Sequence, residues 1–483
     1  MKKLLFLLFQ ICLLCQLNAS ANGWQSNWYA SLRMTGGTGE YLPFWARTGE
    51  DGILPVRNSG LMTAGGDILY ETDKGFYFSA GANLVGACSM KSILNPEPVY
   101  GLVDRAYVSA GWKMLHADLG LKPRHGDLGD LSITGGDIIM SGNARNLPGV
   151  NLYSDWIYFE KGRWFAVKGN LAHYYMSDNR FVKGTMVHDK AIAIRIAAGR
   201  TVELMAGFHH YAQWGGAGIQ ASLNDYVKVF FAKRGGEGDT LSDQLNVYGN
   251  HLGNEWARLI WRRGTRTYTF QYDKPFEDNS GMCFQNFPDG VWTFQFSSGR
   301  TQGLLTDLTC EYINTTWQSG VVHDRPATPE EMAGQDPDSP WYGKVVVGGR
   351  DDYFNNSYYY SGWTYYGRMI GLPLMVPMVP GEDGVCRGVM NNRVRGYHIG
   401  MKGTIYKVPY TFKATFTENF GTYYHPLSSD LWQLSMALET VLLQNIAKLP
   451  VALTVGVYGD VGEFYQKSAG LILKFTYGGS ASF

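Results

Sequence analysis

The end of the chain constrains its fold more than any other feature. Residues 471–483 read L-I-L-K-F-T-Y-G-G-S-A-S-F, with apolar, aromatic or small residues at the odd positions and mostly polar residues at the even positions after Ile472. A period of two predicts a β-strand with one apolar and one polar face. A last strand that ends on an aromatic residue, here Phe483, is typical of outer-membrane β-barrels, where it closes the barrel and meets lipid.

The amino terminus has the pattern of a secretory signal peptide. Two lysines precede an uncharged, mostly apolar run over residues 4–14, and small residues follow up to Ala21. We expect cleavage after Ala21. A lipoprotein anchored at Cys15 is the alternative, which the bulky Leu14 disfavours. The apolar run is too short to remain as a membrane-spanning helix.

Composition is compatible with a barrel but does not establish one. Glycine accounts for 60 of the 483 residues, aromatic residues for 14% and charged residues for 17%, against about 7% glycine and about 25% charged residues in average proteins. Large barrels use glycine at turns and aromatic residues at both membrane interfaces. A soluble sandwich or propeller can share this composition. The formal net charge is zero, which argues against nucleic acid as a partner.

Alternating segments recur along the chain, at 165–171, 202–208, 268–272, 292–296, 410–416 and 451–457. Residues 432–441 fit either a strand or a helix, and we interpret them as a strand. No run of about 18 apolar residues follows the signal peptide. In hydrocarbon only helices and closed sheets satisfy their backbone groups. We therefore predict an all-β, transmembrane antiparallel meander barrel of about 16–18 strands, from about 25 residues per strand and connection.

Three segments make up the predicted domain organisation. Residues 1–21 are the signal peptide, residues 22–54 are an irregular segment for which a place in the lumen is one option, and residues 55–483 form the barrel. The longest interruption, 318–343, is rich in proline and acidic residues. Long loops of such barrels face outward and often carry function.

A search for catalytic motifs finds none, so we expect neither an enzyme nor a cofactor. The chain has no G-x-S-x-G, H-E-x-x-H or P-loop pattern. His209 and His210 are adjacent, so in a strand they point to opposite faces and do not readily share a metal. The four cysteines beyond the signal peptide are far apart and predict no disulfide framework, although one bridge stays open.

One constellation of aromatic, basic and amide residues lies between 348 and 400. Aromatic rings cover the apolar faces of sugars, guanidinium groups bind carboxylates of acidic sugars, and amides read hydroxyl groups. The alternative interpretation is a polar network that fixes loops at the barrel mouth. The candidate polysaccharide-binding residues are Arg350, Asp351, Trp363, Tyr366, Arg368, Asn391, Asn392, Arg393 and His398.

The same region resembles the Wzi capsule-assembly family of Gram-negative outer-membrane proteins. The stretches that carry the resemblance are G-W-T-Y-Y-G-R-M-I-G-L-P at 362–373, N-N-R-V at 391–394, Y-H-I-G-M-K-G at 397–403 and E-N-F-G-T-Y at 418–423. Weaker similarities are L-P-F-W at 42–45, S-G-N-A-R-N-L-P at 141–148 and Q-S-G-V-V-H-D at 318–324. The resemblance implies an outer-membrane barrel of about eighteen strands that binds capsular polysaccharide and has no enzymatic activity.

These observations together predict an outer-membrane protein that binds capsular or other surface polysaccharide and helps to assemble or anchor the capsule. Its other expected partners are outer-membrane lipid and the barrel-assembly machinery. The main alternative is a diffusion porin or glycan-uptake channel, which requires an open lumen. A barrel enzyme and a purely structural outer-membrane protein are further alternatives. An enzyme requires a nucleophile beside a base, or paired carboxylates in one cleft, and no spacing in the sequence indicates either.

Overall fold

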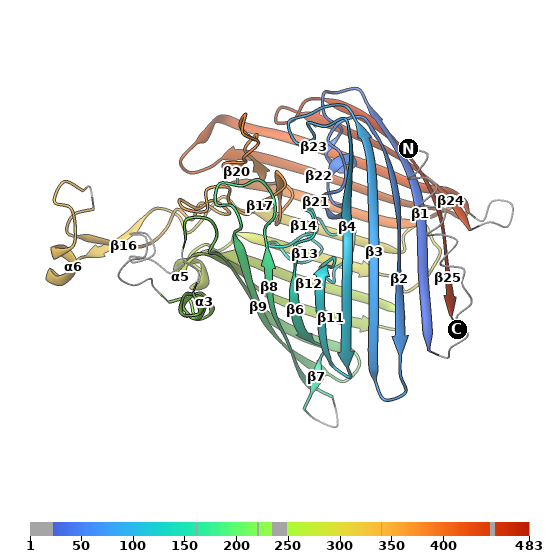
Figure 1. Ribbon diagram of the computed structural model, residues 1–483, viewed down its shortest axis with the longest axis horizontal. Helices are drawn as coiled ribbons and strands as arrows, with labels where there is room; N and C mark the ends of the chain where they lie inside the picture. The colour runs from blue at the N-terminus through green and yellow to red at the C-terminus, as the bar shows by residue number, and fades with distance from the viewer. Residues whose placement is uncertain are drawn as a thin grey trace.

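A computed structural model describes residues 23–159, 163–219, 222–233, 249–339, 341–444 and 450–482. The signal-peptide prediction and the terminal Phe483 lie outside these residues. The chain forms a closed antiparallel barrel of 18 strands (Figure 1). The wall strands are β1 (Trp24–Gly37), β2 (Ser59–Glu71), β3 (Phe76–Ser89), β4 (Val99–Trp112), β5 (Leu115–Leu121), β6 (Pro148–Ser154), β8 (Phe165–Tyr175), β9 (Met186–Ala198), β10 (Val202–Trp214), β11 (Asn250–Arg263), β12 (Arg266–Phe276), β13 (Gly290–Ser297), β14 (Asp307–Asn314), β21 (Val394–Ile405), β22 (Val408–Gly421), β23 (Pro426–Gln444), β24 (Val451–Gly462) and β25 (Ser468–Ser482).

The barrel closes between its first and last strands. β1 pairs with β2 on one side and with β25 on the other, in a register that opposes Leu32 to Phe475. Part of the segment predicted to be irregular is therefore a wall strand, and the barrel begins at Trp24 rather than at residue 55. The alternation of β1 is weak in the sequence because Ser26 lies on the outward face and Tyr29 on the inward face. The rest of that segment lies in the lumen, as described below.

Side chains alternate between lipid-facing and lumen-facing positions along the wall. On β25, Leu471, Phe475 and Tyr477 are 48%, 38% and 39% exposed, whereas Ile472 is 3% exposed and packs inward. This confirms the predicted faces of the last strand. The six other alternating segments all fall within strands, and the ambiguous segment 432–441 lies within β23. The inward positions of the wall are rich in buried polar groups, such as Arg258.

The two ends of the barrel differ in the length of their connections. The end that holds residues 24 and 482 carries mostly short turns, such as those at 72–75, 113–114, 264–265 and 406–407; we call it the turn end. The opposite end, which we call the loop end, carries the connections 38–58, 122–147, 176–185, 215–249 and 315–393. The prediction of long loops is confirmed, and they gather at one end of the barrel; that this end faces the cell exterior stays a prediction. In outer-membrane barrels short turns face the periplasm and long loops face outward.

Short elements lie in the connections. They are α2 (Phe44–Arg47), the 3₁₀ turn η1 (Glu50–Gly52), β7 (Ile157–Tyr158), α3 (Leu223–Phe230), α5 (Asn279–Met282), β15 (His323–Pro326), α6 (Pro329–Ala333), β16 (Lys344–Gly348), β17 (Thr364–Tyr365), β18 (Arg368–Met369), β19 (Val376–Pro377) and β20 (Val389–Asn391). The β15–β16 hairpin and α6 extend away from the barrel (Figure 1). No helix in the described ranges is long and apolar enough to cross a bilayer.

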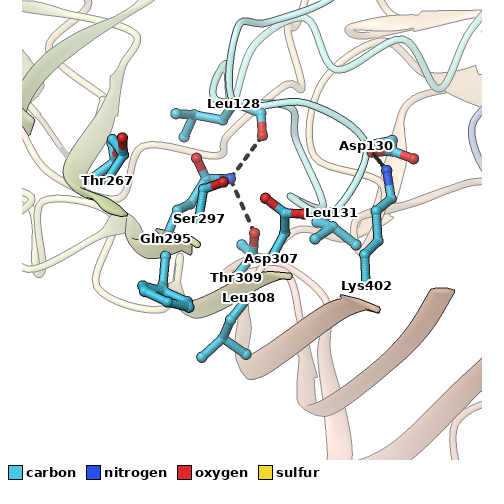
Figure 2. A pocket seen from close by; sticks show the side chains of 12 residues that line it. Leu128, Asp130, Leu131, Thr267, Gln295, Ser297, Asp307, Leu308, Thr309 and Lys402 are labelled. Carbon is cyan, nitrogen blue, oxygen red and sulfur yellow. Dashed lines mark hydrogen bonds and ion pairs between the residues drawn. The ribbon is translucent and has the colours of Figure 1, made fainter. Parts of the chain in front are cut away.

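Loop 122–147 folds into the lumen and is held there by inward side chains of the wall. The amide of Gln295 donates to the carbonyl of Leu128 at 2.8 Å, and Lys402 pairs with Asp130 at 2.6 Å (Figure 2). The remaining contacts of this kind are Arg258 to Asp127, Gln271 to the Gly136 carbonyl, Glu311 to Ser132 and to the Ile133 amide, and Asp273 to the Ile138 amide. The lumen is therefore crossed by a loop that is hydrogen-bonded to strands β11 to β14 and β21.

Loops 38–58 and 315–393 pack onto loop 122–147 from the loop end. Phe44, Ile139 and Trp363 belong to one apolar cluster that these three loops form together with inward side chains of the wall. Leu42 packs against the inward residue Ile472 in a second cluster. The central core of this protein consequently lies inside the barrel, among its loops.

Candidate functional site

Five of the nine predicted ligand-binding residues are buried and hold loops in place. Their exposed fractions are 0% for Trp363, Asn391 and Asn392, 3% for His398 and 7% for Asp351. A buried ring offers no face on which a sugar can stack. The structure thus corrects the prediction for these five residues and assigns them to the alternative role, a network that fixes loops at the barrel mouth.

The contacts of these residues explain why polar side chains gather there. The Asn391 amide donates to Asn419, and its oxygen accepts from the Gly421 backbone N–H. Asn392 donates to Asp352 at 2.6 Å. Amide and carboxylate side chains are tolerated in a protein interior when hydrogen bonds such as these pair their polar atoms. The network ties loop 315–393 to the ends of the wall strands.

The other buried members bond within loop 315–393 or to loop 122–147. Asp351 accepts a hydrogen bond from the Ser319 hydroxyl at 2.6 Å. Nε2 of His398 lies 2.9 Å from the carbonyl oxygen of Leu131 in the lumen. The indole N–H of Trp363 donates to the Ile139 carbonyl at 2.7 Å.

Four predicted residues keep accessible surface, and one of them, Arg368, lines a cavity. Arg350 is exposed, and Arg393 stacks on Tyr423 with 4.2 Å from its guanidinium carbon to the ring centroid. Tyr366 is 39% exposed. Arg368 is partly buried and lines a cavity of about 240 Å³ at the loop end.

This cavity, which we call the mouth cavity, lies where loops 38–58 and 315–393 meet. Arg368 donates to the backbone carbonyls of Arg47 and Leu54 and so joins the two loops. Aromatic rings and apolar side chains form the rest of the cavity lining. The lining includes Tyr41, Phe44, Arg47, Ile93, Leu94, Asn143, Arg368, Met375, Val379 and Tyr465.

The guanidinium groups of Arg47 and Arg368 line the mouth cavity, and Arg145 lies near enough to act electrostatically on Arg368. Arg47 lies over the ring of Tyr465 at 5.0 Å, and Arg145 lies over the ring of Tyr366 at 4.2 Å. Nε of Arg145 is buried and has no hydrogen-bond partner. Among the described residues, Arg47, Arg145 and Arg368 form no ion pair, whereas eleven ion pairs involve other arginines.

The electrostatics of the cluster favour a bound anion. Burial, followed by the positive charges of Arg47 and Arg145, lowers the pKa of Arg368 to about 10. Like charges in a partly buried site repel one another, and an anion in the mouth cavity relieves that repulsion. Guanidinium groups bind carboxylates with paired hydrogen bonds, and tyrosine rings supply apolar surface beside them. The cavity is therefore suited to a carboxylated ligand with an apolar ring face.

Sequence reasoning identified Tyr366 and Arg368 but missed Arg47, Arg145 and Tyr465. These residues come from three separate connections, 38–58, 122–147 and 463–467. No local spacing joins them. The only signals were the L-P-F-W stretch at 42–45 and the S-G-N-A-R-N-L-P stretch at 141–148, which stand next to Arg47 and contain Arg145.

Two further cavities lie in the lumen. One of about 380 Å³ is lined by Arg33, Trp45 and Lys413 and shares Thr48, Asn143 and Pro373 with the lining of the mouth cavity. The other, of about 300 Å³, lies between residues 128–131 and inward side chains of β12 to β14 and β21 (Figure 2). Polar groups such as Gln295, Thr309 and Lys402 line it.

The described residues contain no group of His, Cys, Asp or Glu side chains arranged to hold a metal ion. His209 points into the lumen and contacts Asp189, whereas His210 points to the outer surface and contacts His251. The two adjacent histidines therefore lie on opposite faces, as the alternation predicts. Cys88, Cys283, Cys310 and Cys386 are unpaired.

Comparisons with known proteins support the fold. No family model and no curated protein sequence matches the chain. Among solved structures the chain is similar to Wzi of Escherichia coli, which is described as a carbohydrate-binding β-barrel of the outer membrane involved in group 1 capsule assembly. The two chains are 13% identical, and the alignment covers 99% of this chain and 88% of Wzi, with a TM-score of 0.53.

Matches to other outer-membrane structures have lower scores. OccK5 (OpdH) of Pseudomonas aeruginosa matches at 9% identity, with 95% of this chain and 100% of that chain covered and a TM-score of 0.45. OccAB4 of Acinetobacter baumannii matches at 10% identity, with 96% and 100% covered and a TM-score of 0.47. At such identities the similarity to Wzi concerns the barrel fold alone.

Proposed function

We propose that the protein is an outer-membrane β-barrel that binds an acidic surface polysaccharide at its loop end and helps to assemble or anchor a capsule. The observation that carries the proposal is that Arg47 and Arg368 line the mouth cavity beside Tyr465, and that Arg145, stacked on Tyr366, lies near Arg368. Among the described residues, none of these three arginines forms an ion pair. Uronic acids offer a carboxylate for the arginines and an apolar ring face for a tyrosine.

The position of the site agrees with this function. The loop end faces the cell exterior if the barrel follows the usual orientation, so the mouth cavity is open to surface polysaccharide. Wzi, whose fold this chain shares, is described as a carbohydrate-binding β-barrel involved in capsule assembly, which supports a capsular glycan as the ligand. Outer-membrane lipid and the barrel-assembly machinery are then the remaining partners.

The filled lumen weighs against the porin alternative. Loop 122–147 is bound to the wall on several strands, and the apolar cluster around Trp363 lies above it. A diffusion channel needs a continuous aqueous path, which large barrels keep when their lumen is free of loops.

The test uses the purified full chain with two polymers, a polyuronate and a neutral glucan of similar length. We expect binding to the polyuronate only, and binding that weakens as salt rises, because exposed charges are screened. Arg47→Gln and Arg145→Gln each remove one charge-assisted contact of about 1.5–3 kcal/mol, which corresponds to a loss of about tenfold or more.

Arg325→Gln is the matched control, since Arg325 of β15 pairs with Glu331 of α6, away from the mouth cavity. All variants are first compared by heat-modifiable migration, to confirm that they fold. Equal affinity for both polymers, or full affinity in the Arg47 and Arg145 variants, would show that the mouth cavity does not read acidic sugar. In cells the same two variants should release more capsule into the medium than the control does.

A further inference from the structure

Helix α3 lies on the outer surface of the barrel wall, next to the loop end. Its residue Val229 packs against Ala212 and Trp214 of β10. Along β10 the lipid-facing Leu204 is 51% exposed, and Ala212 and Trp214 lie on the same face as Leu204 because they differ from it by an even number of residues. The helix therefore covers the outward face of β10, outside the lumen.

The helix has three distinct faces. Asp225 and Val229 are buried against the wall. Leu223, Val227 and Phe231, which follow one another at intervals of four, are 81%, 41% and 62% exposed. Residues four apart lie on one side of a helix, so these three form an apolar stripe. Asn224, beside the stripe, is exposed and polar, and the capping box of Ser222 and Asp225 fixes where the helix begins.

The height of the helix on the wall matches the border of the apolar band. β10 runs from Val202 at the turn end to Ala212 beneath α3. Ten residues of a tilted strand rise by about 25 Å, which is also about the height of the apolar band of outer-membrane barrels. At the lower border, Trp261 opposite Val202 pairs with Tyr268 at 5.1 Å, as expected for an interfacial aromatic girdle.

The apolar band of the wall ends just below the helix, where the outward residues Lys190 and His210 face each other on β9 and β10. Below α3, the outward residues Ile192, Ile194 and Leu204 are 56%, 40% and 51% exposed. The stripe of α3 turns away from the wall above this polar row, at the level where acyl chains meet headgroups. Amphipathic helices with this three-way division lie in the plane of the membrane interface.

We propose that α3 is an interfacial helix whose stripe of Leu223, Val227 and Phe231 inserts among the acyl chains of the outer leaflet. The inference rests on the membrane location in the proposed function and is independent of sugar binding. Its partner is acylated lipid. The polar Asn224 faces the headgroup layer, and the buried face keeps the helix attached to β9 and β10.

The experiment measures quenching of a bimane fluorophore by lipids brominated on their acyl chains. The full chain, with its native cysteines replaced by serine, is reconstituted in phosphatidylcholine vesicles with and without brominated chains. Single cysteines are introduced by Val227→Cys on the stripe, Asn224→Cys on the polar face and Ile192→Cys on the wall. Iodide in the buffer provides the complementary aqueous quencher.

We expect the brominated lipid to quench the label at 227 as strongly as the label at 192, and to leave the label at 224 accessible to iodide. Equal lipid quenching at 227 and 224 would overturn the assignment of α3 while leaving the wall in the membrane. A label at 227 that is shielded from both quenchers would also overturn it and would indicate a protein contact. If the label at 192 escaped the brominated lipid, the membrane location itself would fail.

Discussion

The indole N–H of Trp363 donates to the backbone carbonyl of Ile139 at 2.7 Å and joins two loops that lie 224 residues apart in the chain. Trp363 comes from loop 315–393 and Ile139 from loop 122–147, which crosses the lumen. Leu372 and Ser141 add backbone bonds between the same loops. The protein thus closes its barrel from inside with two loops that support each other.

Replacing Trp363 should weaken the contact between loops 122–147 and 315–393 rather than remove a sugar contact. Trp363→Ala empties a fully buried site and should cost about 3–5 kcal/mol. Trp363→Phe should cost less, because the phenyl ring keeps most of the packing and only the hydrogen bond to the Ile139 carbonyl is lost. Proteolysis of loop 315–393 and heat-modifiable migration measure the effect. Tyr360→Ala in the same loop is the control because Tyr360 is 45% exposed; equal protease resistance of Trp363→Ala and this control would argue against this contact.

The stability of loop 315–393 should depend on pH through Asp351. Burial and the nearby charge of Asp278 raise the pKa of Asp351 to about 6, above the usual value of 3.8. The folded state then binds the proton more tightly than the unfolded state, so this contribution is full below about pH 4 and is lost as pH rises through about 6. The loss is at most about 3 kcal/mol.

Protease resistance of loop 315–393 should accordingly be higher at pH 5 than at pH 8. Asp351→Asn, which stays neutral and keeps an oxygen acceptor for Ser319, should flatten this dependence. A variant that retains the full difference between the two pH values would point to other titrating groups.

The wild-type barrel should conduct ions poorly, because loop 122–147 crosses its lumen. Arg258→Ser combined with Lys402→Ser removes the partners of Asp127 and Asp130 at the deepest part of the loop. We expect conductance in planar bilayers to rise in this double variant. Arg325→Gln, outside the lumen, serves as the control. High conductance of the wild-type protein would instead favour the porin alternative.

Strand polarity can be tested on β25. Phe475→Arg places a charge on the lipid face and should destabilise the barrel by about 2–4 kcal/mol near the midplane. Thr476→Arg, on the lumenal face next to it, should be milder. Reversible folding into lipid vesicles measures both, and a larger loss for Thr476→Arg would mean that the register of Leu32 opposite Phe475 is wrong.

Most strands of the barrel wall could be predicted from the sequence, whereas the loops that fill the lumen could not. Alternation along 471–483 and along the other predicted segments is a local property of each strand, so it could be recognised without knowing which strands pair. The sequence did not predict β1 as a strand, because its alternation is broken by Tyr29 on the inward face and Ser26 on the outward face. For the candidate site, the sequence pointed to the loop that contains Tyr366 and Arg368, but could not distinguish the buried Trp363 from an exposed ring.

Local pattern by itself therefore determined the all-β class, the approximate strand number and the lipid-facing side of the last strand. Tertiary structure alone decided that loop 122–147 fills the lumen, that Trp363 joins it to loop 315–393, and that Arg47 and Arg368 line one cavity with Arg145 nearby. The physical reason is distance along the chain. Alternation follows from the backbone geometry of neighbouring residues, whereas a cluster of charges from separate connections exists only after the barrel has closed and brought its loops together.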